Sequence, residues 1–134
     1  NIFENKVLGT AEKLPFEDKS FDNIFCSFVW RNISDTDKAL GEIYRVLKPG
    51  GKFVLLDMTR PKNSILKILH KIGSFKILHL IGLLTFNLKE YRFLYRSLDF
   101  YPQPENHLKM DNFKNINIER MGLFGFVYLA VFTK

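Results

Sequence analysis

Two apolar segments separated by one amphipathic segment restrict the fold of this chain more than any other feature. Asn23–Phe28 and Lys52–Met58 are short and almost continuously apolar, which is typical of strands buried on both faces of a parallel sheet. Between them, apolar residues recur at helical intervals at Leu40, Ile43 and Leu47. A strand, a crossover helix and a second strand in one sheet form a right-handed parallel unit. This order predicts an α/β fold.

Local signals set the expected ends of these elements. Ser34 and Asp37 have the spacing of a capping box, so we expect the helix to begin there, and Pro49-Gly50-Gly51 is expected to stop it. Lys6–Gly9 reads as another short strand that ends at a glycine. The loop after Gly9 should therefore lie at the carboxyl end of a strand.

The second half of the chain predicts helices followed by a hairpin. Apolar spacing predicts a helix over 65–72, which Gly73-Ser74 is expected to break, and another helix over 89–98. Ile116–Met121 alternates, and Phe126–Phe132 follows a turn rich in glycine. The chain is therefore expected to close its sheet with an antiparallel hairpin.

Composition fits one globular domain over 1–134. A chain of 134 residues with 46% hydrophobic content can bury a core, and Cys26 is its single cysteine, so no disulfide framework is expected. No basic and apolar leader is seen at Asn1, and the apolar stretch 77–88 is too short to span a bilayer. We therefore expect a cytoplasmic protein that is neither exported nor integral to a membrane.

The formal net charge of +6 is concentrated in one segment. Residues 61–89 hold five lysines and no acidic residue, and the lysines alternate with Ile, Leu and Phe rather than with base-reading side chains. This pattern argues against nucleic acid as a partner. Two alternatives remain open for 61–89: a cover that contacts anionic lipid at the membrane surface, or an ordinary helical lid over the substrate. Residues 61–100 together are expected to form the helical lid or substrate region.

A series of motifs resembles one enzyme family. The motifs are Gly9-Thr10-Ala11-Glu12-Lys13-Leu14-Pro15-Phe16, Ser20-Phe21-Asp22, Phe28-Val29-Trp30-Arg31-Asn32-Ile33, and Leu47-Lys48-Pro49-Gly50-Gly51. Together they resemble the ubiquinone/menaquinone C-methyltransferase family, the UbiE type, which uses S-adenosylmethionine. The resemblance implies the C-terminal part of a Rossmann-like class I methyltransferase fold, with a mostly parallel sheet. It also implies C-methylation of a quinol precursor or a similar lipophilic aromatic molecule.

The resemblance assigns cofactor contacts to Thr10, Ala11 and Ser27. The family usually has Asp or Asn where this chain has Thr10, to bind the adenine amino group, and a threonine hydroxyl can still accept that hydrogen bond. Ala11 would offer its backbone N–H to the ring, and Ser27 would lie beside the centre of methyl transfer. Structural roles for Thr10 and Ser27 are the alternatives.

The resemblance places the chemistry at Arg31 and Asn32, which follow the second predicted strand. An arginine there can stabilise the phenolate that carbon methylation requires. The alternative is that Arg31 pairs with a carboxylate such as Asp35 or Asp37 and fixes the loop.

Three aromatic residues are expected to contact the substrate. Trp30 stands where the family more often has a small or aliphatic residue, so it could reshape the substrate pocket. Tyr91 and Tyr95 lie one helical turn apart on a segment that resembles the family's helix before its final strands. His70, His79 and His107 lack the spacing of metal ligands, so no metal site is expected.

No glycine-rich turn of the kind that seats the methionine end of the cofactor precedes Gly9. In the family, the first two strands lie before the position of Asn1, so we expect weak cofactor binding by this chain alone and a homo-oligomer that covers exposed strand edges. Two other functions stay open: methylation of another small acceptor such as a sterol or phenol, and a non-catalytic oligomerising or membrane-associated module.

Overall fold

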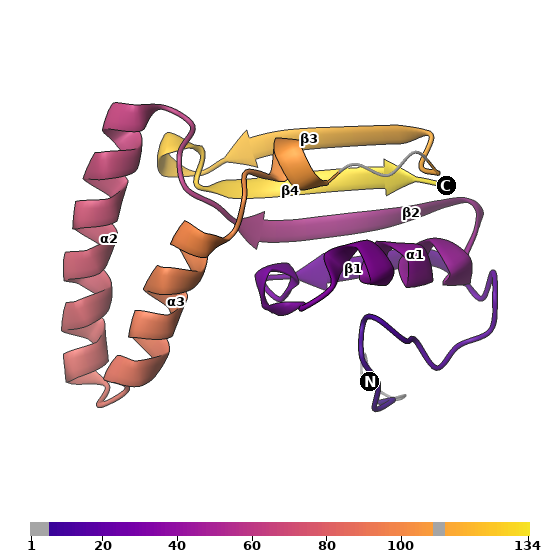
Figure 1. Ribbon diagram of the computed structural model, residues 1–134, viewed down its shortest axis with the longest axis horizontal. Helices are drawn as coiled ribbons and strands as arrows, with labels where there is room; N and C mark the ends of the chain where they lie inside the picture. The colour runs from indigo at the N-terminus through magenta and orange to yellow at the C-terminus, as the bar shows by residue number, and fades with distance from the viewer. Residues whose placement is uncertain (1–5, 109–111) are drawn as a thin grey trace.

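The computed structural model describes residues 6–108 and 112–134, and its strands form one four-stranded sheet in the order β1-β2-β4-β3. Figure 1 shows the sheet at one end of the molecule and a pair of long helices at the other. The elements, in chain order, are β1 (Phe21–Ser27), η1 (Trp30–Asn32), α1 (Thr36–Val46), β2 (Leu47–Met58), α2 (Ser64–Leu84), α3 (Leu88–Phe100), α4 (Pro104–His107), β3 (Asn115–Met121), η2 (Leu123–Gly125) and β4 (Val127–Thr133).

The predicted parallel unit is confirmed. β1 pairs in parallel with β2, and α1 connects them. The predicted terminal hairpin is confirmed too, because β4 pairs antiparallel with both β2 and β3. Among the described strands, parallel pairing joins only β1 and β2, so the α/β class holds while most pairings are antiparallel.

The ends of α1 differ from those predicted. Asp35, rather than Ser34, caps the helix by accepting a hydrogen bond from the Lys38 N–H at 3.0 Å. The helix ends at Val46, before Pro49-Gly50-Gly51. These three residues therefore do not stop the helix but lie inside the next strand, β2. Gly50 has φ +79°, a conformation that glycine adopts at little cost, and its N–H donates to Lys134 at 2.9 Å.

The core lies on the face of the sheet that α1 covers. Alternate residues of the strands point to this face, as the two-residue period of a strand requires. Phe53 from β2 and Phe132 from β4 pack with ring centroids 5.2 Å apart. The buried set is Trp30, Ala39, Leu40, Ile43, Leu47, Phe53, Leu55, Leu108, Phe113, Tyr128, Ala130 and Phe132.

No helix among the described residues packs on the opposite face. Phe25, Val54 and Val131 form one row across this uncovered sheet face, and the Phe25 side chain is 76% exposed. The prediction that the first apolar strand is buried on both faces is therefore wrong for the described residues. Its sequence is apolar enough for burial, but no described element covers Phe25.

The predicted strand at Lys6–Gly9 does not form. The described residues 6–9 have no regular secondary structure, and an isolated bridge joins Thr10 to Lys13. A strand needs a neighbour for its N–H and C=O groups, and no described strand lies beside 6–9.

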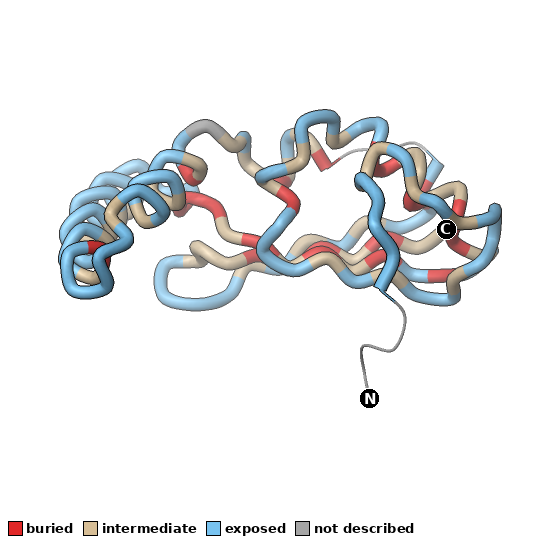
Figure 2. The backbone as a smooth tube through the Cα atoms, turned by 90° about the horizontal axis from the view of Figure 1, so that it is seen from below, coloured by how far each residue is buried: buried red, intermediate tan, exposed pale blue. Residues whose placement is uncertain are grey.

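α2 is one continuous helix, so the predicted break at Gly73-Ser74 is wrong. A helical glycine costs only about 1 kcal/mol relative to alanine, and the Ser74 hydroxyl accepts from Arg60 at 2.9 Å while it donates to the Lys71 carbonyl at 3.2 Å. The predicted helix over 89–98 is confirmed within α3. α2 and α3 form a helical hairpin that extends beyond the carboxyl end of β2 and stands clear of the sheet (Figures 1 and 2).

Candidate functional site

A buried ion pair joins the carboxyl ends of the two parallel strands. The Arg31 guanidinium, in η1 just after β1, binds the carboxylate of Asp57, the penultimate residue of β2. The Arg31 backbone N–H also donates to Asp57 at 3.1 Å, and the Met58 N–H donates to it at 2.7 Å. Asp57 is completely buried. The crevice outside the carboxyl ends of parallel strands is where α/β folds place ligands.

Asp57 was missed at the sequence level. A carboxylate at the carboxyl end of an apolar strand, Leu55-Leu56-Asp57, was the signal that could have found it. The expected carboxylate partner of Arg31, Asp35 or Asp37, is wrong, because Arg31 pairs with Asp57 and Asp35 caps α1. The alternative that Arg31 pairs with a carboxylate to fix the loop stays open with Asp57 as the partner. Arg31 also has a donor to spare, since its buried Nε has no hydrogen-bond partner in the described chain.

Aromatic side chains surround this ion pair. Trp30 is fully buried and packs on Phe53 with ring centroids 5.6 Å apart, and its Nε1 has no partner among the described residues. The Tyr101 hydroxyl lies 2.7 Å from His107 Nε2. Burial, followed by the negative charge of Asp57, raises the pKa of Tyr101 and of Tyr128. Both phenols therefore stay protonated at neutral pH.

The substrate role of Trp30 and the catalytic role of Asn32 stay predictions. The structure places Trp30 in the core, beside the ion pair rather than in an open cavity. Asn32 is exposed at the end of η1, where its backbone N–H donates to Val29 at 2.8 Å. Trp30 can therefore act on a ligand only through the position of η1, unless the aromatic cluster opens.

The loop that carries Thr10 and Ala11 is anchored on α1. Arg45 donates to the carbonyls of Leu14 at 3.0 Å and Phe16 at 2.8 Å, while Glu42 accepts from the Leu14 N–H at 2.9 Å. Hydrogen bonds from Arg45 and from the Leu14 N–H lower the pKa of Glu42 to about 2. The two charged side chains thus hold the backbone of this loop in one position.

This anchored loop presents Thr10 to solvent while Ala11 packs against the core. Ser27 ends β1 with an exposed side chain on the uncovered sheet face, in register with Leu56. No hydrogen bond joins Thr10, Ala11 and Ser27 to one another in the described chain. The Thr10 hydroxyl and the Ala11 backbone N–H suit an adenine ring, and the Ser27 hydroxyl suits a contact beside the centre of methyl transfer, so these residues fit one part of the implied cofactor. Their roles stay predictions.

Arg60 attaches the helical hairpin to the end of β2. Its buried guanidinium donates to Asp99 at 3.0 Å, to the Ser74 hydroxyl at 2.9 Å and to the Tyr95 carbonyl at 3.2 Å. Lys71 adds a second ion pair with Asp99 at 3.1 Å. One arginine therefore contacts both helices of the hairpin.

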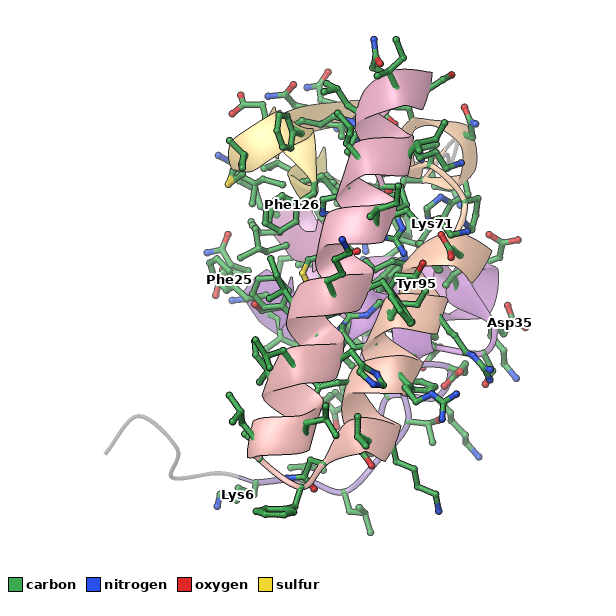
Figure 3. All side chains as sticks on the ribbon, turned by 90° about the vertical axis from the view of Figure 1, so that its left-hand side faces the viewer. Lys6, Phe25, Asp35, Lys71, Tyr95 and Phe126 are labelled. Atoms are coloured by element: carbon green, nitrogen blue, oxygen red, sulfur yellow. The ribbon has the colours of Figure 1, made fainter. Side chains whose placement is uncertain are left out.

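Tyr91 and Tyr95 lie together, as their spacing predicts. Both line a small cavity of about 200 Å³ between α2 and α3, beside Phe75 and Arg96. The Arg60 guanidinium lies 4.9 Å from the Tyr95 ring centroid. A second cavity of about 420 Å³ lies on another side of α2, and neither tyrosine lines it. Figure 3 shows Phe126, which lines this second cavity, and Tyr95 on opposite sides of α2.

Three other features of the described residues bear on function. Residues 6–108 and 112–134 contain no group of three His, Cys, Asp or Glu side chains placed to hold a metal ion. Burial, followed by the charge of Asp57, raises the pKa of Cys26 to about 11, so its thiol is protonated at neutral pH. Over the same residues, no helix is long and apolar enough to cross a membrane.

Solved structures share the fold. An S-adenosylmethionine-dependent methyltransferase from Thermotoga maritima, described as a possible histamine N-methyltransferase, aligns over 94% of this chain and 62% of its own, with a TM-score of 0.61 and 21% identity. The PH0226 protein of Pyrococcus horikoshii aligns over 95% of this chain and 57% of its own, with a TM-score of 0.55 and 20% identity. These similarities confirm the predicted class I methyltransferase fold.

Sequence relatives are more specific. The ubiquinone/menaquinone biosynthesis C-methyltransferase UbiE of Rickettsia bellii is 39% identical over 127 residues, which are 90% of this chain and 51% of that protein. The protein of the same name from Shewanella piezotolerans is 36% identical over 87% of this chain and 48% of its own. The chain thus spans about half the length of the curated relatives it matches. The ubiE/COQ5 methyltransferase family matches residues 4–128, and the chain belongs to that family.

Proposed function

We propose that this chain carries the acceptor side of an S-adenosylmethionine-dependent methyltransferase that methylates carbon on a quinol precursor or a similar lipophilic aromatic molecule. The observation that supports it best is Arg31, fixed by the buried Asp57 at the carboxyl ends of β1 and β2 in a member of this family. Its relatives are named as C-methyltransferases of ubiquinone and menaquinone biosynthesis.

The cofactor would be held at its adenine by Thr10 and Ala11, and Ser27 would contact it beside the centre of methyl transfer. When bound, S-adenosylmethionine supplies an electrophilic methyl group. The loop that carries Thr10 is kept in place by Glu42 and Arg45, so these contacts need little ordering on binding. The described residues offer no glycine-rich turn for the methionine end, and we expect this chain alone to bind the cofactor weakly. Each lost hydrogen bond costs about 1 kcal/mol, so several together reduce affinity by orders of magnitude.

Arg31 would make the acceptor ring reactive. A carbon next to a phenol oxygen becomes nucleophilic when the oxygen loses its proton, and a buried cation lowers the energy of the resulting phenolate. Asp57 holds Nη1 of the guanidinium, which leaves its other donors for that oxygen. The buried Nε is one of these donors, and it would reach the oxygen only if the side chains around it open. Asp57 thus orients Arg31 without the substrate.

A membrane surface would be the source of the substrate. The outward face of α2 carries Ile65, Ile68, Ile72, Leu80 and Leu83, each at least half exposed. A helix with apolar side chains on both its inner and its outer side requires an apolar environment. Lys62 and Lys71 pair with Glu105 and Asp99, so Lys67, Lys76 and Lys89 would provide the attraction to anionic headgroups. We therefore propose a cytoplasmic protein that binds the membrane peripherally through α2.

A chimaera tests the enzymatic function. The half of the Rickettsia bellii relative that precedes its match to this chain would be fused before it, and cofactor binding measured by isothermal titration for the chimaera and for the chain alone. We expect binding only by the chimaera, and methyl transfer to a prenylated quinol. Micromolar affinity of the isolated monomeric chain would contradict the expected division of the cofactor site.

The role of Arg31 is tested in the same chimaera. Arg31→Ala should lower kcat by about 10²- to 10³-fold, the typical effect of losing a group that stabilises transition-state charge, with little change in cofactor affinity. Arg31→Lys keeps the charge and should recover part of kcat. Unchanged kcat with weaker cofactor binding would show that Arg31 serves the cofactor instead.

A non-catalytic oligomerising module is the second candidate, because the uncovered sheet face offers a row of apolar side chains to a partner. The two candidates differ in the chimaera, since a module would bind neither cofactor nor quinol. Methylation of another small acceptor, such as a sterol or phenol, would appear as cofactor binding and transfer with a different substrate preference.

A further inference from the structure

Removing a phenol proton beside Arg31 requires a group that accepts it. Arg31 is a permanent cation and cannot do so. Asp57 already accepts hydrogen bonds from the Arg31 side chain and from two backbone N–H groups. Burial, followed by the charge of Asp57, raises the pKa of Cys26 and of Tyr128, so both keep their protons at neutral pH. The base therefore lies one step farther from the ion pair.

Tyr101 and His107 form a hydrogen-bonded pair at that place. The Tyr101 hydroxyl lies 2.7 Å from His107 Nε2. Tyr101 follows α3, which contacts η1, and the Trp30 indole and the charge of Asp57 both act on the Tyr101 hydroxyl. Both residues of the pair are partly exposed, and Tyr101 also packs against the core. The pair therefore connects the surroundings of the ion pair to the surface.

The hydrogen bonds of His107 fix the position of its proton. His107 Nδ1 lies 2.9 Å from the Gln103 carbonyl oxygen, which can only accept a hydrogen bond, so Nδ1 carries the hydrogen. In the neutral ring Nε2 then has a lone pair, and the Tyr101 hydroxyl donates to it. A third group that orients one nitrogen while the other nitrogen faces a hydroxyl is the arrangement of a histidine that acts as a base.

The groups around His107 make it a neutral base that can hold a proton for a short time. Burial lowers the pKa of His107, so the ring is neutral at pH 7. The Gln103 carbonyl and the charges of Asp37 in α1 and Glu105 in α4 act in the opposite direction. Glu105 also pairs with two cations, Arg120 and Lys62. A proton that reaches Nε2 is therefore stabilised by carboxylates from two elements.

We propose that Tyr101 and His107 remove the proton from a phenol bound at Arg31. The phenol proton moves to the Tyr101 oxygen while the Tyr101 proton moves to His107 Nε2, so Tyr101 ends the step with one proton, as it began. His107 becomes an imidazolium and releases its proton to solvent. Replacing an aromatic hydrogen by a methyl group yields one proton in each turnover, and this relay carries it away. The identity of the phenol rests on the proposed function, whereas the relay requires only a phenol beside Arg31.

Nitrogen NMR of His107, combined with a phenol whose anion is coloured, tests the relay in this chain. The chemical shifts of the two ring nitrogens should place the hydrogen on Nδ1 at neutral pH. 4-Nitrophenol would then be added at a pH at which the free dye is mostly protonated. The visible absorption of its phenolate should appear together with the shifts of an imidazolium at His107. Absence of binding at millimolar concentration, or a phenolate formed beside a neutral His107, would overturn the proposal.

Two phenylalanine variants form a matched pair. Tyr101→Phe removes the hydroxyl that donates to His107. Tyr128→Phe removes a buried hydroxyl that also feels the charge of Asp57 but has no hydrogen-bond partner among the described residues. Tyr101→Phe should abolish the protonation of His107 by 4-nitrophenol, and Tyr128→Phe should leave it unchanged. Equal effects of the two variants would contradict the relay.

His107→Gln separates proton transfer from a structural role. Glutamine keeps a side-chain donor and acceptor for the same neighbours but cannot take a proton at neutral pH. In the chimaera it should lower kcat by about 10²- to 10⁴-fold, the usual contribution of a general base, with cofactor affinity and the urea midpoint unchanged. An unchanged kcat would overturn the proposal and leave the pair a structural contact. A chimaera without methyl transfer would refute the proposed function, and the 4-nitrophenol result would still decide the relay.

Discussion

Replacing Asp57 with asparagine should destabilise this protein far more than a charge change of the same kind at the surface. Asp57 is completely buried, and the Arg31 side chain that it pairs with is only 9% exposed. The carboxamide keeps the shape and can still accept one backbone hydrogen bond, but it leaves a buried guanidinium without its counter-charge. Breaking a buried pair in this way costs about 3–5 kcal/mol.

A matched control comes from the Lys48–Asp22 pair, whose N–O distance is 2.8 Å and whose side chains are 45% and 75% exposed. Asp22→Asn makes the same chemical change in high dielectric, where an ion pair is worth about 0–1 kcal/mol. The expected difference between the two variants is therefore at least about 2 kcal/mol. This is a large part of the roughly 5–15 kcal/mol that stabilises a typical domain.

Urea unfolding followed through Trp30 measures both variants. Trp30 is the single tryptophan and lies beside the ion pair, so its emission reports on this region directly. With a denaturant slope of about 2 kcal/mol per molar, Asp57→Asn should lower the midpoint by about 1.5–2.5 M and Asp22→Asn by under about 0.5 M. Arg31→Met combined with Asp57→Leu should recover part of the loss, because no charge is left unpaired. Equal midpoints for the two single asparagine variants would refute the buried-pair reasoning.

Three further outcomes are expected. The chain should self-associate through the uncovered sheet face, so sedimentation at several concentrations and salt levels should show a dimer. Leu56→Lys should weaken that dimer, and a parent chain that is monomeric at every concentration would contradict the prediction. Glu42 has a pKa of about 2 in the folded protein, below its ordinary value of about 4.3. Its contribution to the free energy of unfolding is therefore present above about pH 4.3 and is lost as the pH falls toward 2. The urea midpoints of the parent and of Glu42→Gln should converge over that pH range. Arg60→Met should release the helical hairpin and speed proteolysis within 64–100, whereas Lys71→Met, at a half-exposed position, should have little effect; equal cleavage rates would show that Arg60 does not hold the hairpin.

Much of the fold follows from local patterns. The period of the apolar residues places α1, β1, β2 and the final hairpin, because side-chain periodicity is a property of each segment alone. The errors occur where a segment needs a partner. Residues 6–9 have the composition of a strand but no described neighbouring strand to pair with. Gly73 stays helical because the helical turns before and after it outweigh the weak helix propensity of one glycine.

The sequence by itself determined the family and the motif residues Thr10, Ser27 and Arg31, because a motif is a pattern along the chain. Only the tertiary structure decided that Arg31 pairs with Asp57, 26 residues away, rather than with Asp35 or Asp37 nearby. The physical reason is geometric: the carboxyl ends of neighbouring parallel strands meet at one edge of the sheet, whatever their separation in the chain. The cavity beneath the hairpin has the same origin, because α2, α3 and η2 meet there only after Arg60 has joined the hairpin to the end of β2.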